Sequence, residues 1–244
     1  MVREELERVS LLIGEEALST LNKASVLVAG VGGVGSYACE ALARSGIGHL
    51  VLVDQDVVVS SNLNRQIMAT HDTIGMSKVE AMKTRIHSYQ PSCLVETKQM
   101  FIGEDCSFVK EVDFVIDAID TVSSKIALIK ACKEANIPFI SSLGMGNRLD
   151  PSEVEISDLF KTSGDPLARS VRQLARKAGI TGAVPVLISK EKPIKQNRIV
   201  NEECATRKER IPPASMIFVP AEAGLLAASY AVRTILGGSQ YESK

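Results

Sequence analysis

Four glycines at positions 30, 32, 33 and 35 follow a short apolar run and precede a stretch that is typical of a helix. Glycines let the backbone turn tightly and come close to a phosphate, and the free N–H groups at a helix N-terminus attract that anion. Asp54 ends the next apolar run, and an acidic residue about 20 residues after such a turn can bind ribose hydroxyls. This order of features predicts a nucleotide-binding domain.

The polar segment after Asp54 distinguishes between nucleotides. Residues 61–66 read Ser-Asn-Leu-Asn-Arg-Gln, which is more than a connection between a strand and a helix requires. Arg65 and Lys78 would place two cations near the phosphates, which suits a triphosphate better than a nicotinamide dinucleotide. The residues expected to bind the nucleotide are Gly30, Gly32, Gly33, Gly35, Asp54, Asp56, Asn62, Asn64 and Gln66.

A second acidic segment follows the fourth expected strand. Residues 115–120 read Val-Ile-Asp-Ala-Ile-Asp. In open parallel sheets, ligands gather at the carboxyl ends of the strands. A carboxylate at that edge can hold magnesium together with substrate phosphates.

These segments together resemble the adenylating, ThiF-like superfamily of ubiquitin-activating, molybdopterin-synthase-activating and thiazole-biosynthesis enzymes. Such enzymes attach AMP to a carboxylate and release pyrophosphate. Within the superfamily, the chain is most similar to the tRNA threonylcarbamoyladenosine dehydratase branch, and the similarity covers nearly the whole chain. The segments that carry it are 40–48, 64–67, 115–120, 149–152, 156–162 and 165–169.

The resemblance implies ATP-dependent activation of the threonyl carboxylate on a modified adenosine next to the anticodon of tRNA. The activated carboxylate is then attacked from within the same side chain, which closes a ring with overall loss of water. By residue match, Asp54 binds the ribose and Asp120 is the magnesium carboxylate. The triphosphate and transition-state contacts match Asn62, Arg65 and Lys78. Arg8 matches an arginine that reaches into the neighbouring subunit's site, which implies a homodimer.

The five cysteines lie at positions 39, 93, 106, 132 and 204, and none forms a Cys-x-x-Cys pair. Related branches use two such pairs to bind zinc, so we expect no structural zinc here. Cys39 and Cys132 fall in apolar helices and are expected to be core residues. Cys204 lies in a polar loop and is the one plausible thiol nucleophile, although an intramolecular cyclisation needs no enzyme thioester.

Composition favours a single soluble domain. The chain has 244 residues, a formal net charge of −1, 45% hydrophobic and 23% charged residues. These values are ordinary for a globular protein, and no apolar run approaches the length of a membrane span. The charged N-terminus is not a secretion signal. We therefore expect a cytoplasmic protein without a membrane partner.

Alternating strand and helix patterns predict a Rossmann-like, mostly parallel sheet with helices on both faces. The nucleotide-binding core is expected over about 14–145. A smaller α+β extension over about 150–219, including a long loop at 189–212, is expected to bind the substrate. A C-terminal helix over about 221–236 is expected to pack against the core.

The extension is basic. Residues 160–210 contain twelve Lys or Arg and five Asp or Glu, a net charge of +7, within a chain of net charge −1. On a helix over about 166–178, Leu167, Val171, Leu174 and Ala178 would share one face, with arginines opposite. A phosphate backbone would satisfy these cations. The residues expected to bind tRNA are Arg169, Arg172, Arg176, Lys190, Lys192, Lys195 and Arg198.

Two other functions are compatible with parts of the pattern. One is adenylation of a ubiquitin-like sulfur-carrier protein, which would use the same nucleotide site and sulfur-transfer partners. The other is a nicotinamide-dependent oxidoreductase or a non-catalytic nucleotide-sensing module. Arg65 and Lys78 argue against the latter pair.

Overall fold

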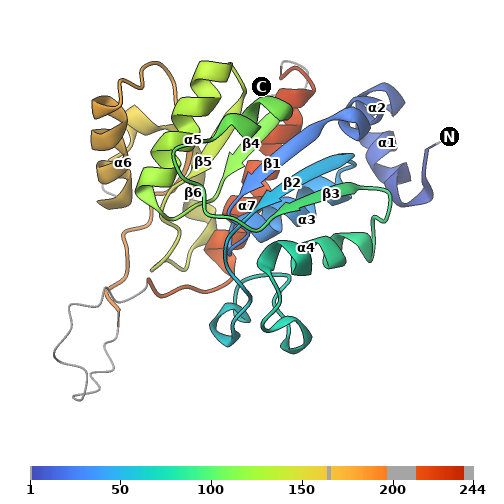
Figure 1. Cartoon of the computed structure of the whole chain (residues 1–244), viewed down its shortest axis with the longest axis horizontal. Helices are drawn as coiled ribbons and strands as arrows, with labels where there is room; N and C mark the ends of the chain where they lie inside the picture. The colour runs from blue at the N-terminus through green and yellow to red at the C-terminus, as the bar shows by residue number, and fades with distance from the viewer. Residues whose placement is uncertain (1, 164–165, 197–212, 239–244) are drawn as a thin grey trace.

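The computed structural model describes residues 2–163, 166–196 and 213–238, and it contains one seven-stranded sheet (Figure 1). The strand order is β3-β2-β1-β4-β5-β7-β6. All neighbouring pairs are parallel except β6 and β7, which are antiparallel. The strands are β1 (Ser25–Ala29), β2 (His49–Val53), β3 (Leu94–Lys98), β4 (Phe114–Asp117), β5 (Phe139–Ser142), β6 (Val154–Asp158) and β7 (Pro185–Ser189).

Seven α-helices are described. They are α1 (Glu7–Ile13), α2 (Glu15–Lys23), α3 (Gly35–Arg44), α4 (Lys78–His87), α5 (Val122–Ala135), α6 (Pro166–Lys177) and α7 (Phe218–Ile235). Short 3₁₀ turns join several of them, including one over Ser107–Glu111.

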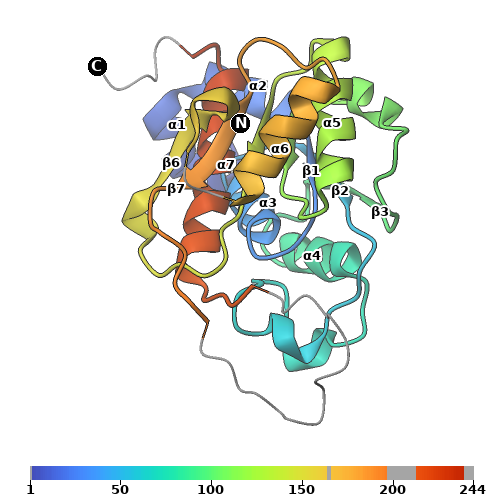
Figure 2. The same cartoon turned by 90° about the vertical axis from the view of Figure 1, so that its left-hand side faces the viewer.

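The helices cover both faces of the sheet (Figures 1 and 2). Successive strand residues point to opposite faces. Thus Val26 and Val28 of β1 belong to the apolar cluster that contains residues of α3, α4 and α7, whereas Leu27 and Ala29 belong to the cluster that contains residues of α5 and α6. The expected Rossmann-like α/β fold is therefore confirmed.

Helix α7 lies along α3 and reaches the glycine turn that precedes α3. A Cβ atom added to Gly224 would lie 2.4 Å from the carbonyl oxygen of Val34, so only glycine permits this approach. A Cβ on Gly33 would lie 3.2 Å from Cβ of Pro220. The C-terminal helix thus packs against the core, as expected.

Several boundaries differ from the sequence-based expectations. Helix α1 was not expected, and α7 begins at Phe218 rather than near 221. Residues Ser107–Glu111 form a 3₁₀ turn. Beyond residue 150, β7 pairs with β5, so the strands of the expected extension continue the same sheet.

The topology determines where a ligand can bind. Strand β1 lies between β2 and β4, and all three are parallel. The chain therefore leaves β1 in one direction and β4 in the other, which opens a crevice at the carboxyl ends of these strands. None of the described helices is long and apolar enough to span a membrane.

Candidate active site

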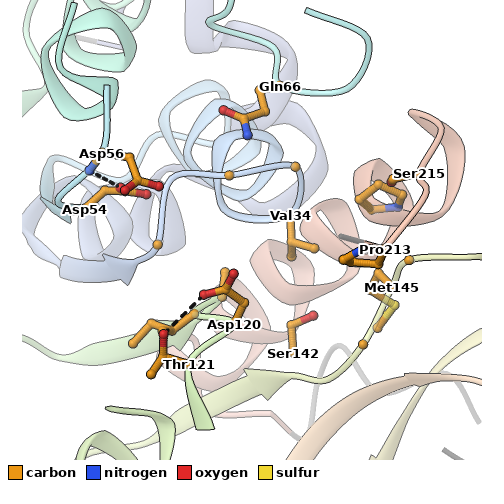
Figure 3. Close-up of a pocket in the computed structure, with 18 of the residues that line it drawn as sticks. Val34, Asp54, Asp56, Gln66, Asp120, Thr121, Ser142, Met145, Pro213 and Ser215 are labelled. Carbon is orange, nitrogen blue, oxygen red and sulfur yellow. Dashed lines mark hydrogen bonds between the residues drawn. The ribbon is translucent and has the colours of Figure 1, made fainter. Parts of the chain in front are cut away.

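A cavity of about 640 Å³ opens at this carboxyl edge (Figure 3). The glycine turn forms one wall, together with the end of β2 and Lys78. The connections that follow β4 and β5 form much of the remaining lining, together with residues after β3 and before α7. The cavity thus brings together segments from both halves of the chain.

The glycine turn tolerates no side chain at two of its positions. Gly30 has φ +86°, and an added Cβ would lie 2.7 Å from the carbonyl oxygen of Ala118. A Cβ on Gly35 would lie 1.8 Å from the carbonyl oxygen of Gly30. Gly32 and Gly33 line the cavity, so a phosphate can approach their backbone.

Asp54 connects the end of β2 to the glycine turn. Its Oδ2 accepts a hydrogen bond from the N–H of Val31 (2.7 Å), and its Oδ1 accepts one from the N–H of Asp56 (2.8 Å; Figure 3). The ammonium group of Lys78, which is buried, lies 2.7 Å from Oδ2 of Asp56 and 4.0 Å from Oδ1 of Asp54. These expected site residues therefore do lie together.

Only some of the expected residues in the segment after β2 line the cavity. Asn62, Arg65 and Gln66 line the cavity. Within the described chain, the Oε1 atom of Gln66 is buried without a hydrogen-bond partner, and Figure 3 shows the amide directed toward the glycine turn. Asn64 does not line the cavity: its amide donates to the carbonyl of Ser215 (2.9 Å).

Arg65 is held in place by its own segment. Its Nη1 atom donates to the carbonyl of Ser61 (2.8 Å) and to Oδ1 of Asn64 (2.9 Å). The guanidinium group keeps further N–H donors for a ligand.

The two aspartates after β4 differ in their surroundings. Asp117, at the strand end, is buried and ion-paired with Lys125, and it does not line the cavity. Asp120 is exposed and lines the cavity, with Thr121 Oγ1 at 3.4 Å from its Oδ1 (Figure 3). Asp120 is therefore the carboxylate available to a ligand.

Sequence reasoning missed the part of the wall that follows β5. Ser142, Met145 and Arg148 line the cavity there, and Pro213 and Ser215 line it from the segment before α7 (Figure 3). Residues after β5 could have been found, because parallel strands end at the same edge of a sheet. Pro213 and Ser215 carry no such signal in the sequence.

Asn147 joins two segments that are distant in sequence. It has φ +61°, a conformation that asparagine tolerates better than most residues. Its Oδ1 accepts hydrogen bonds from Nε2 of Gln196 (3.0 Å) and from the N–H of Ala214 (3.0 Å). Its own N–H donates to the carbonyl of Ala214, and its carbonyl accepts from Ile194. Asn147 therefore holds both segments beside the cavity.

Arg8 lies on α1, which is exposed and outside the cavity. Figure 1 shows α1 and α2 at the N-terminal ends of the central strands, opposite the carboxyl edge. Within one chain, Arg8 is thus separated from the other expected catalytic residues.

Of the expected basic residues that the structure describes, none lines the cavity. Arg169, Arg176, Lys192 and Lys195 are exposed. Lys190 is ion-paired with Glu155 (2.5 Å), and that partner raises the pKa of the lysine. Arg172 donates to the hydroxyl of Thr162, and the guanidinium of Arg176 lies 5.7 Å from the centre of the Phe160 ring. Arg198 lies outside the described residues.

The expected apolar face of α6 is confirmed at Val171, is half-buried at Leu167 and was wrong at Leu174 and Ala178. The buried residues are Ala168, Val171 and Ala175, whereas Leu174 is 40% exposed and Ala178 is also exposed. Both stripes have helical spacing, and small alanines allow the helix to approach the core more closely than leucine would.

Four cysteines are buried: Cys39, Cys93, Cys106 and Cys132. The predicted core role of Cys39 and Cys132 is confirmed. Burial raises the pKa of Cys106 to about 11 and of Cys132 to about 12, so both stay protonated near neutral pH. Cys204 lies outside the described residues.

Comparison with known proteins identifies the family of this chain. The family model described as the ThiF family matches residues 6–242. The chain belongs to the ThiF family. A Bacillus subtilis (strain 168) tRNA threonylcarbamoyladenosine dehydratase is 44% identical over 240 residues, covering 95% of this chain and 94% of that relative.

Two solved structures support the same relationship. Both are E. coli tRNA N6-threonylcarbamoyladenosine dehydratase and both are 33% identical to this chain. The complex with AMP has a TM-score of 0.88 and covers 98% of this chain and 97% of its own. The complex with ATP has a TM-score of 0.86, with 99% and 97% covered. The resemblance expected from the sequence is confirmed.

Proposed function

We propose that this chain is an ATP-dependent tRNA threonylcarbamoyladenosine dehydratase. It would adenylate the threonyl carboxylate of the modified adenosine and then cyclise it with overall loss of water. The observation that carries this proposal is the end-to-end match to dehydratases, including structures with ATP and AMP. Cytoplasmic tRNA would be the substrate.

The cavity supports ATP binding in a defined orientation. The phosphates would lie against Gly32 and Gly33 at the N-terminal end of α3, where backbone N–H groups and the helix dipole favour an anion. Asp54 keeps free lone pairs for ribose hydroxyls beyond its two backbone hydrogen bonds. Gln66 lines the same wall.

Asp120 suits a role in holding magnesium. Its exposed carboxylate offers the oxygen ligands that this ion prefers. In the described residues there is no group of three or more His, Cys, Asp or Glu that could hold a metal. Magnesium instead commonly binds one or two carboxylates plus substrate phosphates, and when bound it would neutralise phosphate charge.

Arg65 and Lys78 would stabilise the charge that develops during adenylation. The substrate carboxylate attacks the α-phosphorus of ATP, a bond from that phosphorus to oxygen forms, and pyrophosphate leaves. Lys78 is paired with Asp56, so its ammonium is already oriented toward the wall of the cavity. In the second step an atom of the same side chain attacks the activated carbonyl carbon, and AMP leaves with the carboxylate oxygen.

No enzyme thiol is required for the second step. Holding nucleophile and activated carbonyl on one side chain gives a high effective concentration. The raised thiol pKa values of Cys106 and Cys132 also disfavour a nucleophilic role for these residues.

We propose that the region over about 150–219 binds the tRNA through the exposed cations of α6 and the segment after β7. Arg169 and Arg176 on α6, and Lys192 and Lys195 after β7, are exposed. Lys190 and Arg172 have partners within the chain, so we assign them smaller roles.

We propose a homodimer in which Arg8 reaches the partner's cavity. Arg8 is exposed on α1, far from the cavity of its own chain (Figure 1). The same helix exposes Leu11 (81%) and Leu12 (83%). Adjacent exposed leucines are typical of a protein interface.

The proposal is tested by pyrophosphate exchange into ATP. With magnesium, tRNA bearing threonylcarbamoyladenosine should stimulate exchange, and mass spectrometry of the nucleoside should show loss of one water. The same tRNA without the modification is the control. Stimulation by a ubiquitin-like protein ending in two glycines, and not by the modified tRNA, would favour sulfur-carrier adenylation instead.

The Asp120→Ala variant tests the assignment of the site. Because loss of charge stabilisation of this kind is typically worth several kcal/mol, turnover should fall by roughly a hundredfold or more. In the unchanged protein, a separate binding measurement should show that NAD does not compete with ATP at similar concentrations. Normal turnover in the folded variant would remove Asp120 from the mechanism.

A further inference from the structure

A buried cluster of three polar side chains lies directly behind the cavity wall. The "Lys125 cluster" consists of Asp117 at the end of β4, Lys125 in the first turns of α5, and Ser141 in β5. Each is at most 1% exposed. None of them lines the cavity, so none would touch the substrate.

All three N–H donors of the Lys125 ammonium group have a hydrogen-bond acceptor. The ammonium group of Lys125 donates to Oδ2 of Asp117 (2.8 Å), to the hydroxyl of Ser141 (3.1 Å) and to the carbonyl of Ser142 (2.9 Å). Ser141 in turn donates to Oδ2 of Asp117 (2.6 Å). Three donors meet three acceptors, so the geometry of the lysine is fixed.

A buried ion pair of this kind need not add stability. Removing two charges from water is costly, and replacing a buried ion pair with well-packed apolar groups is often neutral or stabilising. The cluster joins the carboxyl ends of β4 and β5 to the start of α5. The Asp120 loop, residues 118–121, connects β4 to α5, and β5 is paired with β4 beside it.

The loop is restrained on two sides. The second carboxylate oxygen of Asp117, Oδ1, accepts a hydrogen bond from the N–H of Ile119 (3.1 Å). On the side of the glycine turn, the N–H of Ala118 donates to the carbonyl of Ala29 (2.8 Å). Asp120 follows Ile119 directly, so the position of its carboxylate depends on these restraints.

We propose that Asp117 and Lys125 are positioning residues that hold the Asp120 carboxylate at the distance from the glycine turn that the reaction requires. This inference rests on the proposed role of Asp120. The ion pair restrains both ends of the loop, because Asp117 directly precedes the loop and Lys125 lies in the first turn of α5, which follows it. The hydrogen bond to Ser142 extends the same restraint to the next segment of the cavity wall.

The test uses the paired variant Asp117→Asn with Lys125→Met, which leaves no uncompensated buried charge. Because small displacements of a catalytic group can cost about a hundredfold, turnover should fall by roughly tenfold or more. The melting temperature and the affinity for ATP without magnesium should stay close to those of the unchanged protein. Lys130→Met is the matched control, since the Lys130 side chain is 54% exposed on the same helix.

A double-mutant cycle separates positioning from general structural damage. If the Lys125 cluster acts through Asp120, adding the paired change to Asp120→Ala should cost no further turnover. Multiplying losses would overturn the inference. Calorimetry provides a second readout: the gain in ATP affinity on adding magnesium should shrink in the paired variant toward its value in Asp120→Ala.

The outcomes distinguish the inference from the proposed function. Normal turnover in Asp120→Ala would reject the proposed role of Asp120 itself. Impaired Asp120→Ala beside a fully active paired variant would reject only the positioning role. If the paired variant does not fold, Ser141→Ala removes one hydrogen bond of the cluster, keeps both charges and enters the same cycle.

Discussion

At the scale of single residues, the glycines of the turn have different physical roles. Gly35 cannot carry a side chain, because an added Cβ would overlap the carbonyl of Gly30 at 1.8 Å. At Gly32 the nearest atom to an added Cβ is Nε2 of Gln66 at 3.9 Å, which is ordinary contact. Gly35 is therefore required for the backbone conformation of the turn, whereas Gly32 leaves space for a ligand.

This difference predicts opposite phenotypes. Gly35→Ala should prevent correct folding of the turn and lower the melting temperature strongly. Gly32→Ala should leave the melting temperature unchanged yet weaken ATP binding by about tenfold or more, because the methyl group would meet the phosphates. Differential scanning fluorimetry with and without ATP measures both. Full ATP affinity in Gly32→Ala would show that the phosphates do not approach this residue.

At the scale of elements, the strands and helices of the nucleotide-binding half were predictable, because apolar runs, glycines and acids recur there in a fixed order. Which face of α6 is buried could not be predicted. Two stripes of helical spacing overlap, and only packing against the core decides that Ala168 and Ala175 are buried while Leu174 is not. Helix α1 was missed because it is short and contains no buried residue.

The exposed face of α6 carries the prediction about tRNA. Arg169→Glu combined with Arg176→Glu should weaken tRNA binding and reduce the slope of log affinity against log salt by about two, since each phosphate contact contributes about one. ATP binding should not change. Lys23→Glu combined with Lys110→Glu, two exposed lysines elsewhere, makes the same charge change as a control. Equal tRNA affinity in both variants would assign these arginines to solubility.

At the scale of the whole molecule, the cavity is assembled from segments that are remote in sequence. The glycine turn, Asp54 and Asp120 could be predicted, because each follows an apolar strand at the same sheet edge. Asn147, Lys125 and Ser215 could not, because their roles depend on contacts across the fold. Arg8 belongs to this scale too, since its proposed role needs a second chain.

Mixing inactive subunits tests that proposal. Arg8→Ala and Asp120→Ala should each be nearly inactive, yet a mixed dimer contains one cavity with both residues intact. Because random exchange in a twofold dimer gives half mixed dimers, roughly a quarter of full activity should return. Mixing each variant with itself is the control. Absence of recovery in demonstrated mixed dimers would place Arg8 outside the partner's site.

The contact between α7 and the glycine turn also affects how the chain matures on the ribosome. Pro220 and Gly224 support Gly33 and Val34, although some 190 residues separate them in sequence. Synthesis proceeds from the N-terminus, so the turn emerges long before its support does. The nascent chain would thus complete the support of its phosphate site only once residues 220–224 have been synthesised, and changes at this start of α7 would damage a site formed by residues 30–35.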